Sequence, residues 1–378
     1  MEAIIFGLAD VSNSIFASLK VPGIKDSLSI GESNGREVLL LIDGLGQLAF
    51  DQYAKQFDEA NLVKQFAKLS ANFPSTTATS LTTIGTGVLP GVHGMLGYTV
   101  RIPRSDNRIL NALKWDDRVD PLHWQKTPTL FERANQAGIK TFHVAAKRYE
   151  QTGFTQAALR GATYIGANQL SDMANAVKDS LNSQISDSAF VYTYLNIVDS
   201  AGHNDGVGSE KWLIALGQAL SYVKMLADSV PKNTRIWITS DHGMVNKSEQ
   251  IILGQDNDLL TDVELIAGEP RARHIYVKAG ALNEVKSRWE QTLGSKVSVL
   301  SKDTAITAGY FGATVSTDSY ERLGDLIVIS HDNFILVDPA KAKEESAMVG
   351  HHGGITELET AIPLLQRSEE HTSELQSH

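Results

Sequence analysis

The sequence predicts an α/β protein: a doubly wound, mostly parallel sheet flanked by helices, with a small inserted α+β cap. Two observations support this fold class. Continuous apolar runs, typical of parallel strands buried on both faces, recur along the chain, and an amphipathic helical pattern precedes each run after the first. A late segment is more polar and favours a separate small unit. The predicted strands lie at 37–42, 140–146, 189–196 and 235–240, and the predicted helices at 127–138, 167–182 and 209–230.

The small unit is predicted within residues 246–320, where the sequence becomes more polar. It contains two candidate strands and one candidate helix, so we expect a compact cap. Two later apolar runs are expected to return to the main sheet. The candidate strands of the cap are 273–279 and 296–301, its candidate helix is 283–294, and the returning runs are 322–330 and 333–338.

The chain has no internal repeat and no low-complexity linker, which favours one core with a cap over two independent domains. We therefore expect a catalytic core of residues 1–245 and 321–366 around the cap at 246–320. The last segment, "RSEEHTSELQSH" at 367–378, resembles an in-frame translation of a sequencing adapter. We exclude that segment from the fold as an artefactual tail.

Composition limits the classes of function. The net charge is −10, which disfavours a polymeric nucleic acid as partner, because such proteins need clustered Lys and Arg. No apolar window is long enough for a membrane span, and the first twenty residues lack the charge pattern of a signal peptide, so we expect a cytoplasmic protein. Cysteine is absent, so any metal must be held by histidines and carboxylates.

Candidate metal ligands stand where three of the predicted strands end. Asp43 follows the first strand in "IDGLG", Asp199 and His203 are four residues apart in "DSAGH", and Asp241 and His242 are adjacent in "SDHG". A spacing of four puts two side chains on one face of a helical turn. Taken singly, each motif has an ordinary alternative: a turn, a solvated pair, or a buried hydrogen-bonded pair.

A fourth motif, "GHHGGI", contains His351 and His352. One histidine from this doublet, two from the earlier motifs and three aspartates form a mixed nitrogen and oxygen ligand set, which suits Zn²⁺ and less surely Mn²⁺. That many ligands are enough for two ions about 4 Å apart, the arrangement used in phosphoryl transfer. In open α/β sheets such sites lie beyond the carboxyl ends of the strands.

Residues 71–87, "ANFPSTTATSLTTIGTG", hold six threonines and two serines. A threonine hydroxyl is a poor nucleophile at neutral pH, and direct coordination to a metal is one way to activate it. Thr77 is expected in the first turn of a helix, where free backbone N–H groups also attract a phosphoryl oxygen. The other hydroxyls are explained by helix caps and packing.

In this order the motifs resemble the alkaline phosphatase superfamily, most closely its nucleotide pyrophosphatase/phosphodiesterase branch. The resemblance covers residues 37–366 and implies two divalent ions, with Zn²⁺ favoured and Mn²⁺ as the alternative. It also implies that Thr77 attacks phosphorus to give a phospho-threonine intermediate, which water then hydrolyses. His93, in the run after the nucleophile, is implied to be structural. The implied ligands are Asp43, Thr77, Asp241 and His242 for the first ion, and Asp199, His203 and His352 for the second.

The substrate is expected to be a small phosphate ester or a nucleotide, cleaved at a phosphodiester or pyrophosphate bond. Tyr98 stands where the family's diesterases usually carry an asparagine, so a tyrosine hydroxyl is a candidate donor to the phosphoryl group. Trp115 and Trp124 are candidates for stacking on a nucleobase or an apolar leaving group, although such residues more often anchor a loop. The alternatives are a phosphomonoesterase or phosphonate hydrolase with the same machinery and, less favoured, a non-catalytic binding protein.

Overall fold

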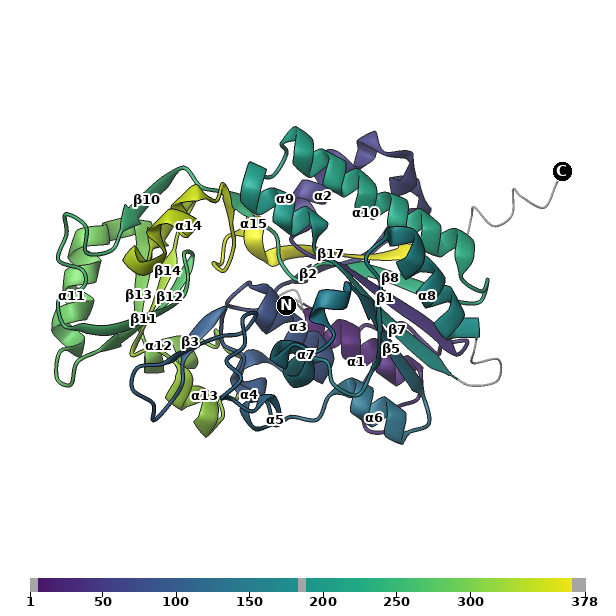
Figure 1. The fold of residues 1–378 in the computed structure, drawn as a ribbon, viewed down its shortest axis with the longest axis horizontal. Helices are drawn as coiled ribbons and strands as arrows, with labels where there is room; N and C mark the ends of the chain where they lie inside the picture. The colour runs from purple at the N-terminus through teal and green to yellow at the C-terminus, as the bar shows by residue number, and fades with distance from the viewer. Residues whose placement is uncertain (1–5, 183–187, 369–378) are drawn as a thin grey trace.

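The computed structural model describes residues 6–182 and 188–368, and its centre is a seven-stranded sheet (Figure 1). The strand order is β2-β17-β8-β1-β7-β5-β6. All neighbours in the stretch from β8 to β6 are parallel, and β17 alone runs against both of its neighbours. The strands are β1 (Arg36–Ile42), β2 (Val63–Ser70), β5 (Lys140–Ala145), β6 (Thr163–Gly166), β7 (Ala189–Leu195), β8 (Arg235–Thr239) and β17 (Ala361–Arg367).

Helices cover both faces of this sheet, as the doubly wound prediction requires (Figure 1). Strand β1 shows why: Leu39 and Leu41 point into the core on one face, and Val38, Leu40 and Ile42 point into the core on the other. A strand buried on both faces has no polar alternation, which explains its continuous apolar sequence. The first core includes α1 (Leu8–Ser18), α3 (Thr77–Thr86), α6 (Leu130–Gln136) and α7 (Gly153–Ala158), and the second α2 (Gln47–Tyr53), α8 (Leu170–Asn182), α9 (Ile197–Asp205) and α10 (Glu210–Ser229).

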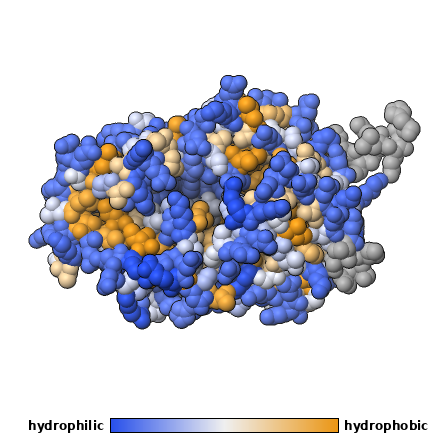
Figure 2. All heavy atoms as spheres, in the orientation of Figure 1, coloured by the Kyte–Doolittle hydropathy of each residue, from blue (hydrophilic) through white to orange (hydrophobic). Residues whose placement is uncertain are grey.

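A second, antiparallel sheet forms the small unit at the left of Figure 1, in the order β11-β12-β14-β13. Helix α11 packs on it through Val285, Trp289 and Leu293. Apolar side chains gather over this region on the face shown in Figure 2. The elements are β11 (Val263–Glu269), β12 (Ala272–Val277), α11 (Leu282–Leu293), β13 (Val297–Ser301) and β14 (Leu326–Ser330).

The expected return of two runs to the main sheet is wrong. The run expected to return to the main sheet forms β14, which lies between β12 and β13 of the small sheet, and the next run forms β15 (Phe334–Val337), paired with β10 (Glu249–Ile252). All five residues of β14 are buried, so its sequence is as apolar as that of a central parallel strand. The chain returns to the large sheet only at β17.

The segment excluded as a tail begins inside a strand. Arg367 is the last residue of β17 and pairs with Val63 of β2, which does not test the origin of the segment. Residues 369–378 lie outside the described residues, so the adapter-like origin of that segment stays a prediction. Within the described part of the chain, no helix combines the length and hydrophobicity needed to cross a bilayer.

Candidate active site

The candidate site lies at the carboxyl edge of the three central strands. Asp43 directly follows β1, Asp199 is in the first turn of α9 after β7, and Asp241 and His242 follow β8. Because β8, β1 and β7 are parallel neighbours, their ends meet at one edge of the sheet. Gly44 allows the chain after β1 to pass close to α9. Its φ is +75°, and a Cβ there would lie 2.9 Å from the Asp199 Cα atom.

Thr77 is the first residue of α3 and faces one group of predicted ligands. Its hydroxyl lies 3.2 Å from His242 Nε2 and 3.5 Å from Asp43 Oδ2. His242 Nε2 in turn lies 3.4 Å from both Asp43 Oδ1 and Asp241 Oδ2. All four side chains are buried. The structure therefore brings together the whole set predicted for the first ion.

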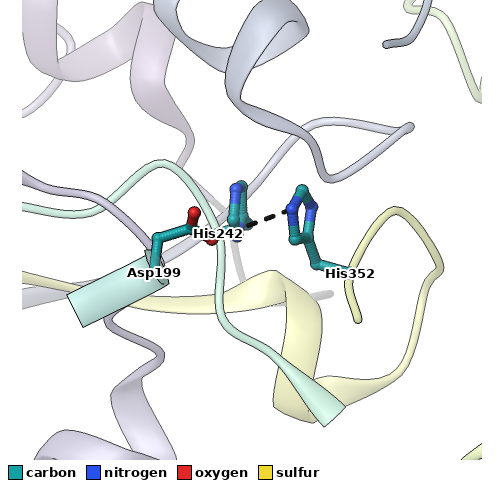
Figure 3. Close-up of side chains that lie close together, drawn as sticks. All are labelled: Asp199, His242 and His352. Carbon is teal, nitrogen blue, oxygen red and sulfur yellow. Dashed lines mark ion pairs between the residues drawn. The ribbon is translucent and has the colours of Figure 1, made fainter. Parts of the chain in front are cut away.

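The set predicted for the second ion also comes together. Asp199 Oδ1 lies 3.4 Å from His203 Nε2 and 3.8 Å from His352 Nε2. The rings of His352 and His242 stack with centroids 3.6 Å apart, so the two sets adjoin. Figure 3 shows Asp199, His242 and His352 close together. Among the described residues, two groups of three have ligand atoms close enough for one ion, and His242 belongs to both: Asp43 with Asp241 and His242, and Asp199 with His242 and His352.

The protonation of the histidines prepares them as ligands. The Nδ1 atoms of His242, His203 and His352 face the carbonyl oxygens of Gly243, Gly350 and Ser75, at 3.0, 2.8 and 2.9 Å. Since a carbonyl oxygen only accepts, each Nδ1 carries a hydrogen, which leaves Nε2 as the nitrogen oriented to coordinate a metal. Burial, together with His242 and His203, also holds the pKa of His352 well below its usual range.

The hydrogen bond of His351 differs from that of His352, which is the candidate ligand of the two. Its Nε2 atom faces the Met348 carbonyl oxygen at 3.3 Å, so that nitrogen carries the hydrogen, and His351 belongs to neither group whose ligand atoms are close enough for one ion. Burial lowers the pKa of His351 to about 3. His351 therefore acts as a neutral packing residue within β16 (Gly350–His351), beside the candidate ligand.

The carboxylates show that the site fits a cation. Asp43 Oδ1, Asp199 Oδ1 and Asp241 Oδ2 are buried and have no hydrogen-bond donor among the described residues. Burial, followed by the charges of Asp241 and Asp199, raises the pKa of Asp43 well above its ordinary value. Buried carboxylates without partners are costly unless an ion compensates them, so this donor set fits divalent metal.

Sequence reasoning missed Tyr194, which donates a hydrogen bond to Asp43 Oδ2. Tyr194 lies on β7, two residues after Tyr192, and both side chains project to the same side of the strand. The Tyr192 hydroxyl has no hydrogen-bond partner in the described part of the chain. Nothing in the local pattern distinguishes the two tyrosines, because the contact depends on the register between β7 and β1.

A pocket of about 140 Å³ borders Thr77, and the predicted substrate residues are not among those that line it. Trp124 is only 6% exposed, and the Arg322 guanidinium covers its ring at 3.7 Å from the centroid. Trp115 packs edge-on against Trp124 and donates from its indole to the Val119 carbonyl at 2.7 Å. The prediction that these tryptophans stack on a substrate is corrected: they anchor a loop.

Tyr98 and His93 both make contacts outside the pocket. The Tyr98 backbone N–H donates to Glu269 Oε2 at 2.9 Å, and its ring lies 5.9 Å from the Lys341 ammonium, so Tyr98 contacts the small unit rather than the pocket. His93 is buried, with Nε2 at 3.0 Å from the Thr83 hydroxyl and Nδ1 accepting from the Met95 N–H at 3.1 Å. His93 therefore supports the turn after α3.

Several solved structures are similar to this chain. Human ectonucleotide pyrophosphatase/phosphodiesterase 5 is 17% identical with a TM-score of 0.69, covering 88% of this chain and 87% of that chain. Its murine counterpart is 15% identical with a TM-score of 0.67 and 88% coverage of each. Phosphonoacetate hydrolase from Sinorhizobium meliloti 1021, bound to phosphonoacetate, is 17% identical with a TM-score of 0.65, covering 88% and 90%. No curated protein sequence matches the chain.

The fold is thus that of the alkaline phosphatase superfamily, and the protein is a metal-dependent phosphoric ester hydrolase. Residues 38–355 match the sequence model of the type I phosphodiesterase / nucleotide pyrophosphatase family. That match spans most of the chain, so the chain belongs to this family.

Proposed function

We propose that this protein hydrolyses a phosphodiester or nucleotide pyrophosphate bond of a small molecule, with Thr77 as the nucleophile. The observation that carries the proposal is the position of the Thr77 hydroxyl, 3.2 Å from His242 Nε2 and 3.5 Å from Asp43 Oδ2. An inactive threonine-to-alanine variant of murine ectonucleotide pyrophosphatase/phosphodiesterase 5, bound to AMP, supports a threonine nucleophile and a nucleotide-like ligand.

Two divalent ions, Zn²⁺ in preference to Mn²⁺, are part of this proposal. Asp43, Thr77, Asp241 and His242 would hold one ion. The ligands of the second would be Asp199, His203 and His352. When bound, such ions lower the pKa of a coordinated hydroxyl and neutralise the charge that develops on the leaving oxygen.

The residues of the chain carry out the nucleophilic attack. The Thr77 hydroxyl gives its proton to solvent as its oxygen attacks phosphorus, and the bond from phosphorus to the leaving oxygen breaks. A phospho-threonine results, and the leaving oxygen takes a proton from water. Water then attacks the same phosphorus and loses a proton, the bond from phosphorus to the Thr77 oxygen breaks, and that oxygen takes a proton to restore the hydroxyl. The α3 N-terminus supports this chemistry: Thr76 at its N-cap makes no side-chain capping bond, so the N–H groups of the first turn can bind a phosphoryl oxygen.

A second candidate is a phosphonate hydrolase or phosphomonoesterase that uses the same nucleophile. The likeness to phosphonoacetate hydrolase, bound to phosphonoacetate, favours it, as does the absence of the family's asparagine at Tyr98. Rates on a bis-aryl diester, an aryl monoester, an aryl nucleotide ester and phosphonoacetate, each with added Zn²⁺ or Mn²⁺, would separate the two candidates.

Replacement of the nucleophile tests the mechanism shared by both candidates. Thr77→Ala should lower kcat by roughly 10³-fold or more, because the covalent step is lost. Thr77→Ser keeps a hydroxyl and should retain part of the rate. Acid quenching during turnover should trap a phosphorylated peptide from the Ser or wild-type protein and none from the Ala variant. Undiminished hydrolysis by Thr77→Ala would overturn the proposal.

A further inference from the structure

The loop that leads to the nucleophile and the loop that carries His352 are joined directly to each other. Ser75 and Gly353 form an isolated antiparallel bridge, in which the Ser75 N–H donates to the Gly353 carbonyl oxygen at 3.3 Å. Ser75 stands two residues before Thr77, and Gly353 directly follows His352. The bridge therefore connects the expected attacking group with a candidate metal ligand from the far end of the sequence.

The Ser75 hydroxyl adds two more bonds to this bridge. It donates to the Gly354 carbonyl oxygen at 2.8 Å and accepts from the Gly353 N–H at 3.2 Å. In the part of the chain that the structure describes, neither of these backbone groups has another hydrogen-bond partner. Ser75 is 0% exposed and both glycines are buried, so loss of the hydroxyl would leave an N–H and a carbonyl unpaired inside the protein, which is costly.

The carbonyl group of Ser75 acts on the histidine itself. Its oxygen accepts from His352 Nδ1 at 2.9 Å, although the two residues lie 277 positions apart, and His352 Nε2 lies 3.8 Å from Asp199 Oδ1. The same imidazole stacks on His242, whose Nε2 lies 3.2 Å from the Thr77 hydroxyl. Ser75 thus fixes the rotation of the His352 ring and holds its loop beside the nucleophile.

Ser75 does not touch the reacting groups. It does not line the pocket beside Thr77, and it belongs to neither group of candidate ligands. The His352 loop has two other supports, but they lie on other elements: β16 pairs with β9 (Val245–Asn246), and the Gly354 N–H donates to Glu359 Oε1 at 2.8 Å. The contact with Ser75 is the one that joins this loop to the segment before α3.

We propose that Ser75 is a positioning residue, whose hydroxyl and carbonyl groups hold the His352 imidazole in place relative to Asp199 and Thr77, as tight binding of the second ion requires. The inference rests on the proposed function and adds a residue on which the metal site depends. Contacts that orient metal-binding histidines from outside the ligand set are typically worth about 10- to 100-fold in metal affinity or activity.

Zinc affinity tests this role without relying on catalysis. The metal-free, full-length protein would be titrated with zinc in competition with a chelating dye, and the wild type should bind two ions. Ser75→Ala should weaken one of the two steps by about 10- to 100-fold and leave the other unchanged, because the first set of ligands keeps its contacts. The weakened step should be the one that Asp199→Ala abolishes, since Asp199 is a ligand of the second ion alone.

Two further variants separate positioning from packing. Ser75→Cys keeps the size of the side chain, but a thiol is a weak donor and a weak acceptor, so this variant should bind zinc as weakly as Ser75→Ala. Ser18→Ala is the matched control: Ser18 is 4% exposed, and its hydroxyl donates to the Ile15 carbonyl oxygen at 2.7 Å within α1. It should leave both steps unchanged. Circular dichroism checks that each variant folds, and Ser75→Cys carries the test if Ser75→Ala does not fold.

Three results would overturn the inference: wild-type zinc affinity in Ser75→Ala or Ser75→Cys, equal weakening of both steps, or the same loss in Ser18→Ala. Each of them leaves the proposed function standing, provided that the zinc-loaded wild type turns over a candidate substrate. A wild-type protein that binds no zinc, or that binds zinc and hydrolyses none of the candidate substrates, would refute the proposed function instead.

Discussion

The buried ion pair between Arg271 and Glu359 should be worth far more to stability than a surface pair. Both side chains are 0% exposed, and two parallel hydrogen bonds of 3.0 and 2.9 Å join them. Arg271 comes from the turn between β11 and β12 of the small unit, and Glu359 from α15 (Glu357–Thr360) beside the large sheet. Glu359 also accepts from the Gly354 N–H at 2.8 Å. The pair therefore links the small unit to the loop that carries His352.

Arg271→Met leaves the Glu359 carboxylate buried without its cation, which costs roughly 3–5 kcal/mol. With a typical free energy of unfolding of about 5–15 kcal/mol, this is a large share of the total. Arg104→Met is the matched control, since Arg104 is 80% exposed in its pair with Glu321, and surface pairs contribute about 0–1 kcal/mol. Adding Glu359→Gln to Arg271→Met should recover part of the loss, because the uncompensated charge is then gone.

Urea unfolding of the full chain, followed by tryptophan fluorescence and by circular dichroism, would measure these differences. Coincident transitions are required before the free energies are compared. Zinc affinity should fall along with stability in Arg271→Met, because the His352 loop loses a support. The reasoning is refuted if Arg271→Met and Arg104→Met differ by less than about 1 kcal/mol, or if the double variant is no more stable than Arg271→Met alone.

Two further predictions concern protonation. Burial raises the pKa of Asp43, and the hydrogen bond from Tyr194 partly offsets that rise. Tyr194→Phe should therefore raise this pKa further and move the pH midpoint of zinc binding upward, as measured by competition with a chelating dye, whereas Tyr192→Phe should leave it unchanged. Three buried histidines titrate well below their unfolded pKa, so the unfolded state binds more protons and the free energy of unfolding should fall as pH drops from about 6.5 toward about 4, by about 1.4 kcal/mol per pH unit for each. These residues are His93, His143 and His274, whose pKa values burial lowers to about 3, about 3 and about 4. Urea titrations across that pH range measure the effect, and a free energy of unfolding that does not change with pH would contradict it.

Much of the fold could be read from the sequence because local patterns carry it. In the run at 37–42, residues 38–42 are all apolar, as only a strand buried on both faces needs to be, and Asp43 marks the point where the apolar run ends. The same logic located Asp199 and Asp241, and parallel strands bring such ends together. That these side chains converge is seen in the structure; their role as metal ligands stays a prediction.

The rest depended on contacts between segments far apart in the sequence. Leu326–Ser330 has the composition of a central parallel strand, yet it pairs in the small sheet, because partner choice is a property of the whole chain. Trp124 had an aromatic ring suited to stacking, but Arg322, 198 residues away, covers it.

The sequence by itself determined the order of strands and helices, the family and the set of polar residues at the strand ends, since burial and chemistry leave a local pattern. Only the tertiary structure decided which sheet each late strand joins, that Tyr194 rather than Tyr192 reaches Asp43, and how much space remains beside Thr77. Strand register and cavity volume arise from many distant contacts at once, and no short stretch of residues records them.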